Sequence, residues 1–176
     1  MTIDDVKSWL RERGTETVGH PGGTLYAHLG RVHDRLAAFG HGPDVCLAGL
    51  THAVYGTDGF DLTLLDAGDR APLRRLVGER AEALVHLYGA CDRSRTWSVL
   101  PESRQVWNRW TGVAEPLPGD LLTAFADLTI VNELDVAEHD ASMAREHGPY
   151  FRTVFGAWQG VASAPVLAEV GRVFGA

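Results

Sequence analysis

The sequence predicts an all-α fold in a single domain over residues 1–176. Apolar residues recur three and four positions apart through much of the chain, which is the spacing of one face of a helix. No stretch alternates between apolar and polar residues as a half-buried strand does. Clusters of Gly and Pro interrupt the helical stretches and mark the turns between them.

Each expected helix follows from an apolar stripe and from the turn residues beside it. A short amphipathic helix is expected over about residues 3–13, before the chain-breaking run His20-Pro21-Gly22-Gly23. Thr24 can cap a helix that runs to Phe39. Further helices are expected over residues 44–54, 71–77, 79–91 and 121–141, with more helical turns after Tyr150.

Composition argues against several classes of protein. The net charge is −7, with 16 Lys and Arg against 23 Asp and Glu, so we expect no nucleic-acid partner. Two cysteines form no disulfide framework, which favours the cytoplasm. The N-terminus lacks the apolar centre of a signal peptide, and no stretch approaches the ~18 apolar residues of a membrane span. We therefore expect a cytoplasmic protein with no membrane partner, and a homodimer is left open.

Three polar side chains are predicted to face buried surface. His28 lies on a stripe with Leu25 and Leu29, His52 ends an almost wholly apolar helix, and Asp127 has apolar helical neighbours. A buried carboxylate needs a cation, a metal or several donors. Two histidines and one carboxylate suit a divalent transition metal, and three helices can donate them into a bundle core. Two core histidines, with an aspartate that caps a helix or pairs with Arg, are the alternative.

The same residues resemble the motifs of the HD-domain metalloenzymes. In that superfamily an early helical His precedes an apolar helix that ends in a His-Asp dyad, and a late helical Asp follows. Leu25–His28 resembles the first motif, Ala48–Thr57 the second, and Asp127 takes the place of the late Asp. The region is also similar to the hydrolase domain of the alarmone (ppGpp) synthetase–hydrolases, whose next helix resembles Leu76–Val85.

This resemblance spans residues 24–135 and implies an HD-domain-like helical bundle, followed by a C-terminal helical extension over residues 145–176. The whole chain also resembles a family of uncharacterised bacterial proteins related to HD domains. One departure matters: Ala53 replaces the dyad Asp. The acidic pair of the alarmone hydrolases is also absent, since Gly56 and Thr57 stand there.

The departure implies a site for one metal ion. In the HD-type diiron oxygenases, which are similar to myo-inositol oxygenase, the dyad Asp bridges two irons, so its loss disfavours a dinuclear centre. His28, His52 and Asp127 would leave coordination positions open, which on iron suit oxygen and a chelating substrate. We expect one divalent metal ion, with Fe(II) favoured and Zn or Mn as alternatives.

Three further residues are candidates for catalysis. Tyr55 and Asp58 follow His52 in a glycine-containing loop, so we expect them to border the pocket. Asp58 is either a substitute ligand or a turn residue. Arg31 lies near His28 and could hold an anionic substrate, or it could simply be a solvated helix residue.

The sequence thus supports three functions. The first is a mononuclear metalloenzyme acting on a small molecule, with a lean to oxidative chemistry at non-haem iron. The second is an HD-type metal-dependent phosphohydrolase, although no lysine occurs after Lys7 to bind phosphate. The third is a metal-free binding protein on a degenerate HD scaffold.

Overall fold

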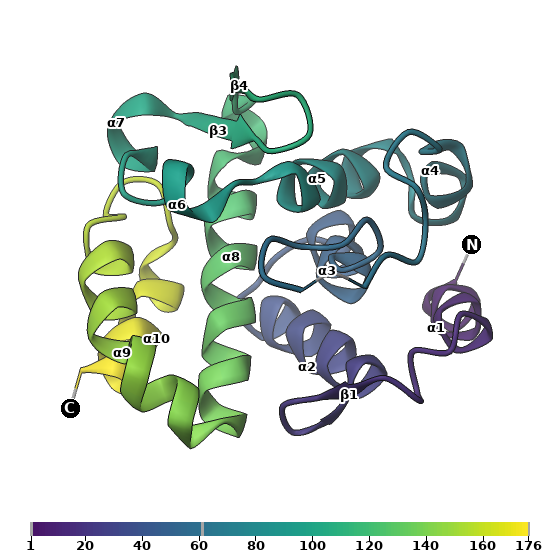
Figure 1. The fold of residues 1–176 in the computed structure, drawn as a ribbon, viewed down its shortest axis with the longest axis horizontal. Coiled ribbons are helices and arrows are strands. Elements are labelled where there is room, and N and C mark those ends of the chain that lie inside the picture. Colours follow the sequence, from purple (N-terminus) through teal and green to yellow (C-terminus); the bar gives the residue numbers. More distant parts are fainter. Residues whose placement is uncertain (1, 61, 176) are drawn as a thin grey trace. The chain divides into compact units, whose positions relative to one another are not determined.

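A computed structural model describes residues 2–60 and 62–175, and this part of the chain is mainly helical (Figure 1). The helical fold class is therefore confirmed at this coarse level. The chain divides into two compact units, Met1–Gly89 and Ala90–Ala176. The single domain expected for residues 1–176 stays a prediction.

The first unit contains most of the residues predicted to carry function. Its elements are α1 (Ile3–Glu12), β1 (Gly19–His20), β2 (Gly23–Thr24), α2 (Leu25–Ala38), α3 (Pro43–Thr51), α4 (Ala71–Val77) and α5 (Glu79–Ala90). Thr24 caps α2 as predicted, because its Oγ1 accepts the backbone N–H of Ala27 at 3.2 Å. The apolar stripe predicted for α2 is buried and packs against α3.

The contact between α2 and α3 is close because a glycine lies in it. A Cβ at Gly49 would stand 2.5 Å from Cδ1 of Leu36 and 3.3 Å from Cγ1 of Val32. Atoms at 2.5 Å overlap, so a side chain at this position would have to displace the terminal methyl group of Leu36. This close contact brings the C-terminal end of α3, and the residue that follows it, near α2.

The helix α3 ends earlier than the predicted Val54. Thr51 is its last residue, His52 is the C-cap, and Val54 donates its N–H to the carbonyl of Thr51 at 3.0 Å. The residues after Thr51 therefore follow tight turns instead of a continuing helix. Ala53, Val54 and Tyr55 are nonetheless buried, which explains why their apolar character extended the predicted helix.

Two short hairpins correct the expectation that the chain has no strands. In the first unit β1 pairs antiparallel with β2, where only a turn was expected. Gly22 and Gly23 have φ values of 78° and 128° there, in a region that non-glycine residues rarely adopt. Strands of two residues are too short to show any alternation in sequence.

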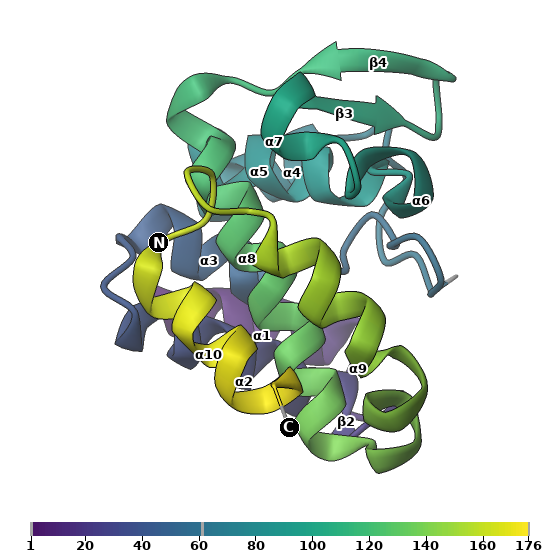
Figure 2. The same cartoon turned by 90° about the vertical axis from the view of Figure 1, so that its left-hand side faces the viewer.

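The second unit is built around a long buried helix. Its elements are α6 (Arg93–Thr96), α7 (Leu100–Ser103), β3 (Gln105–Asn108), β4 (Val113–Pro116), α8 (Gly119–His139), α9 (Ala141–Gly156) and α10 (Ala164–Phe174). The helices α8, α9 and α10 pack against one another (Figure 2). The last two lie where the sequence predicts a helical extension.

Aromatic side chains form the core of this unit beside α9. Rings of Trp97, Phe151, Phe155 and Trp158 lie with centroids 5.0–6.4 Å apart. The indole N–H of Trp158 donates to the carbonyl of Trp97 at 3.0 Å, so this polar group is satisfied although it is buried. Trp97 is thus a core residue, whereas Trp110, at the turn of the β3–β4 hairpin, is 37% exposed.

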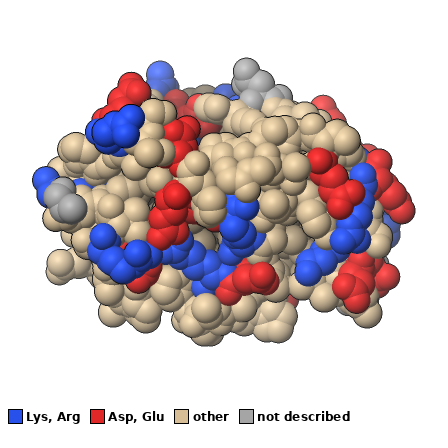
Figure 3. Space-filling model, turned by 90° about the horizontal axis from the view of Figure 1, so that it is seen from below, with Lys and Arg blue, Asp and Glu red and all other residues tan. Residues whose placement is uncertain are grey.

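The surface carries both signs of charge. On the face shown in Figure 3, Lys and Arg lie interspersed with Asp and Glu. Among the described residues, no helix combines the length and the apolar character that crossing a membrane requires.

Candidate functional site

The first unit places His28 and His52 next to each other. His28 lies on the buried face of α2 and is 1% exposed, and His52 directly follows α3 and is 2% exposed. Their ring centroids are 5.2 Å apart, with the planes at 81°. The two imidazoles are therefore neighbours in a buried region, because the close α2–α3 contact holds the helices that carry them.

A backbone hydrogen bond determines the tautomer of His52. Its Nδ1 lies 2.8 Å from the carbonyl oxygen of Gly49. A carbonyl oxygen can only accept, so Nδ1 carries the proton and Nε2 keeps its lone pair in the neutral ring. Histidines that bind metals commonly donate their other ring N–H in this way. His52 can form this hydrogen bond because it is the C-cap of α3 and so directly follows the last helical turn, which contains Gly49.

The histidine pair is part of a longer row of rings. The ring of His20, from β1, stacks on His28 with centroids 4.0 Å apart and planes at 25°. Phe60 lies edge-on to His20 at 5.7 Å, and Tyr88 of α5 lies edge-on to His52 at 5.3 Å. We call His20, His28 and His52 the histidine row.

Asp127 belongs to the second unit, where it is fully buried on α8. Its Oδ1 accepts the backbone N–H of Ser163 at 2.8 Å, and Ser163 is the N-cap of α10. This contact resembles the helix-capping role that the sequence left as an alternative to metal binding. The carboxylate thus stabilises the start of α10, whatever else it contacts.

Tyr55 belongs to a buried ionic network. Its hydroxyl donates to Oε1 of Glu82 at 2.9 Å. Arg70 binds the same carboxylate with Nε and Nη2, both at 2.7 Å, and Nε of Arg74 lies 3.6 Å from Oε2. The Glu82 side chain is 0% exposed, so its charge depends on these partners.

The network shifts the pKa values of Glu82 and Tyr55. Burial opposes ionisation of Glu82, but the hydrogen bonds from Arg70 and Tyr55 outweigh it and hold the pKa of this carboxyl below its ordinary value. Burial, then the hydrogen bond to Glu82, raises the pKa of Tyr55 well above 10. Tyr55 therefore stays protonated at neutral pH and connects the chain after His52 to α5.

The other two candidates for catalysis also make local structural contacts. The guanidinium of Arg31 donates to the carbonyl oxygens of Pro21 and Gly22, at 3.0 and 3.3 Å, and so holds the β1–β2 hairpin on α2. Asp58 lies in a tight turn in which Thr57 and Phe60 exchange backbone hydrogen bonds at 3.0 and 3.3 Å. The turn role considered for Asp58 thus matches its position.

Two residues of this region were not predicted. His20 lies eight positions before His28, and only the hairpin folds it back onto α2. Glu82 was not predicted, although Ala81 and Val85, which lie near it on α5, are both buried. The available signal was the spacing of Glu82 and Val85, which are three residues apart and therefore lie on the same face of the helix.

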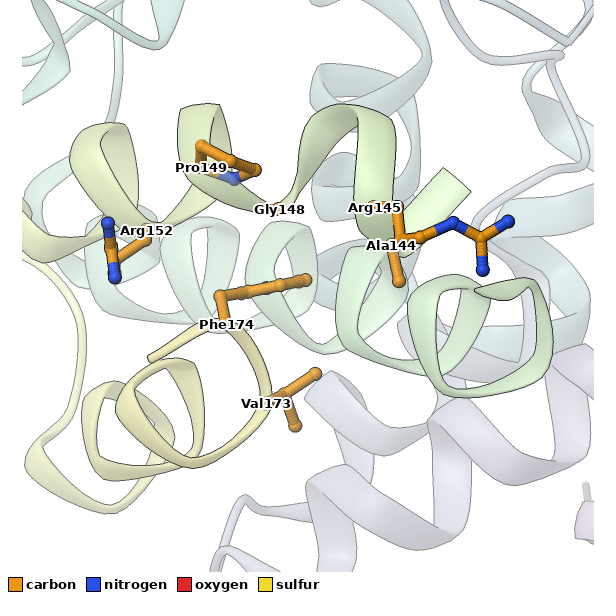
Figure 4. Close-up of a pocket in the computed structure, with 7 residues that line it drawn as sticks. All are labelled: Ala144, Arg145, Gly148, Pro149, Arg152, Val173 and Phe174. Atoms are coloured by element: carbon orange, nitrogen blue, oxygen red, sulfur yellow. The ribbon is translucent and has the colours of Figure 1, made fainter. Parts of the chain in front are cut away.

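Within residues 2–60 and 62–175, no group of three or more His, Cys, Asp or Glu is arranged so that it could hold a metal ion. The second unit has a cavity of about 270 Å³ between α9 and α10 (Figure 4). It is lined by Ala144, Arg145, Gly148, Pro149, Arg152, Val173 and Phe174. None of the predicted site residues lines this cavity.

The comparisons with known proteins leave the function open. A family model described as a domain of unknown function (DUF6817) matches residues 9–93, so the chain is similar to that family over this segment. The segment includes the whole histidine row and Glu82 but not Asp127. No curated protein and no solved structure matches the chain.

Proposed function

We propose that this protein is a metal-dependent enzyme that acts on a small molecule, with His28 and His52 as ligands of one divalent ion. The observation that carries the proposal is the hydrogen bond from Nδ1 of His52 to the carbonyl of Gly49. It leaves Nε2 as a lone-pair donor in a buried region, next to a second buried imidazole. Asp127 is the proposed third ligand and would offset part of the charge of the ion.

The donor set fits a transition metal better than magnesium or calcium. Imidazole nitrogen suits iron, zinc and manganese, whereas the harder ions prefer oxygen. Fe(II) is favoured within the proposal, with Zn or Mn as alternatives. When bound, such an ion would supply open coordination positions for oxygen and substrate, or would acidify a water molecule.

The protein's own residues would position and shield this site. The Gly49 carbonyl orients the His52 ring, and the Tyr88 ring covers one side of it. Tyr55 holds the turn after His52 through Glu82 and, because its pKa is raised, is no general base at neutral pH. We therefore assign Tyr55 a supporting role and not proton transfer.

The fold and setting belong to the same proposal. An early helical His on α2, a His at the end of α3 and a helix that begins after Gly78 support an HD-domain-like bundle. We propose a cytoplasmic protein with a small-molecule substrate, either as a monomer or as a homodimer.

Elemental analysis of the untagged protein, purified without added metal or chelator, tests the proposal. About one iron per chain supports oxidative chemistry, and about one zinc or manganese supports the HD-type phosphohydrolase. His28→Ala and His52→Ala should each lose the metal with helicity unchanged. His33→Ala is the matched control, since His33 lies on α2 and its Nδ1 contacts Asp34 at 2.8 Å. Unaltered metal content in both site variants would refute the proposal.

A metal-free binding protein is the second candidate, and one observation favours it. The His20 and His28 rings are stacked, so their in-plane lone pairs do not converge on a common point. Such rings could instead form the wall of a binding pocket. This candidate requires that the chain binds no iron, zinc or manganese even after anaerobic addition of each ion.

A further inference from the structure

We propose that the cavity between α9 and α10 binds a small organic acid that has an apolar chain and a carboxylate at each end. The cavity lies within the second unit, and no residue of the histidine row lines it. Its volume of about 270 Å³ suits a small molecule, since pockets for such ligands begin at about this size. The inference is therefore independent of the proposed metal site.

The middle of the cavity is apolar. Val173 and Phe174 of α10 line it together with Ala144, Gly148 and Pro149 of α9 (Figure 4). Gly148 has no side chain to occupy the space, and a Cβ there would stand 3.6 Å from Cδ1 of Phe174. These residues offer no charged group to a ligand, so this part of the cavity favours a hydrocarbon chain.

A positive charge lies at each end of the apolar part. Arg145 and Arg152 both line the cavity, and both belong to α9. Seven residues correspond to two helical turns, so the two side chains leave the same face of α9, roughly 10 Å apart along its axis. Figure 4 shows them at opposite ends of the cavity, with Val173 and Phe174 between them. A chain with an acid at each end matches this arrangement of charge.

Both guanidiniums are available to bind an anion. Arg145 and Arg152 are exposed, and neither makes an ion pair or a hydrogen bond with another residue that the structure describes. Asp140 interacts with Arg145 at longer range, but its carboxylate caps the start of α9. In the same unit, Arg93 and Arg172 both pair with glutamates.

Arginine is suited to recognising the ends of such a ligand. Its planar guanidinium can donate two parallel hydrogen bonds to one carboxylate. A ligand with two carboxylates would use both Arg145 and Arg152, whereas a ligand with one would leave one guanidinium solvated. The second acid should therefore strengthen binding, and the apolar chain between the acids should add to it by covering Phe174.

Calorimetric titration of the full chain with linear dicarboxylates, from hexanedioate to dodecanedioate, tests the proposal. We expect one ligand per chain for the length that fits best. Arg145→Gln and Arg152→Gln should each weaken its binding about 10-fold or more, because each loses hydrogen bonds between charged groups. Glutamine keeps a high helix propensity, so α9 should persist. Arg75→Gln is the matched control, since Arg75 is an exposed arginine of α4 that does not line the cavity.

Two further comparisons locate the ligand. The monocarboxylate of the same length should bind about 10-fold more weakly than the dicarboxylate. Gly148→Met should prevent binding without lowering the thermal stability, because a flexible apolar side chain would fill the space beside Phe174. Gly148→Ala, expected to weaken binding less, serves as a second variant if Gly148→Met does not fold.

The proposal is overturned if the wild-type chain binds none of the dicarboxylates, or if Arg145→Gln and Arg152→Gln bind them as Arg75→Gln does. Equal affinity for the monocarboxylate would refute the two-ended ligand. Undiminished binding to a folded Gly148→Met chain would show that the acid binds outside this cavity.

Discussion

Replacing Gly49 by Ala tests the packing that places His52 beside His28. The added Cβ would lie 2.5 Å from Cδ1 of Leu36, so this methyl group, which is fully buried, would have to shift. Overpacking of this kind destabilises by about 1–3 kcal/mol, and the severe overlap favours the upper half of that range. Alanine recovers about 1 kcal/mol through its higher helix propensity. We therefore expect a net loss of about 1–2 kcal/mol in the free energy of unfolding.

Gly30→Ala is the matched control for this experiment. Gly30 lies on α2, and a Cβ there would meet nothing within 4 Å, so this variant should gain up to about 1 kcal/mol. Urea denaturation followed by circular dichroism measures both variants, with the m-value as a check that the same transition is observed. If Gly49→Ala is as stable as Gly30→Ala, the close α2–α3 contact is not what the structure describes.

Three further predictions concern the buried carboxylates. Glu82→Gln should lower the free energy of unfolding by about 3 kcal/mol, because Arg70 loses its buried anionic partner. Tyr55→Phe removes only one hydrogen bond and should lower the free energy of unfolding by about 1 kcal/mol. Thermal denaturation measures both variants. The pKa of Glu82 is below its ordinary value of 4.5 in the folded chain, so its stabilisation is complete above that pH and is lost as the pH falls through the lowered pKa. Denaturation from pH 7 to pH 3 should therefore show the wild type and Glu82→Gln converging in acid. Asp127→Asn keeps an oxygen that can accept from Ser163, so it should be more stable than Asp127→Ala by about 1 kcal/mol, again by thermal denaturation.

Each of these predictions has an outcome that would count against it. Glu82→Gln within about 0.5 kcal/mol of the wild type would mean that the network contributes no more than a surface ion pair. A constant difference between these two proteins across the pH range would exclude Glu82 as the titrating group. Equal stability of the two Asp127 variants would show that the contact with Ser163 does not stabilise α10.

The longer helices could be predicted from sequence because apolar stripes and punctuating residues mark them, whereas the four-residue helices α6 and α7 were not predicted. Thr24 at the start of α2 and Gly78 between α4 and α5 were both recognised in their observed roles. The end of α3 was misplaced, because Ala53 and Val54 are buried in turns and a buried turn has the same apolar composition as a helix.

The side-chain partners were harder to predict than the helices. Periodicity indicated that His28 and His52 face inward, but the stacking of His20 depends on a hairpin whose strands have two residues each. Arg31 was considered for anion binding, and its contacts with the hairpin carbonyls are tertiary. Spacing along one helix contains no information about contacts of this kind.

The most direct test of the proposed metal site is nitrogen NMR of the histidine rings, in protein labelled with ¹⁵N-histidine. Long-range ¹H–¹⁵N correlation distinguishes a protonated ring nitrogen from one with a lone pair. In the metal-free protein His52 should carry its proton on Nδ1, and addition of Zn(II) should shift Nε2 of His52 and a ring nitrogen of His28 while His33 and His147 stay unchanged. A proton on Nε2 of His52, or unmoved His28 and His52 signals at saturating Zn(II), would contradict the metal site.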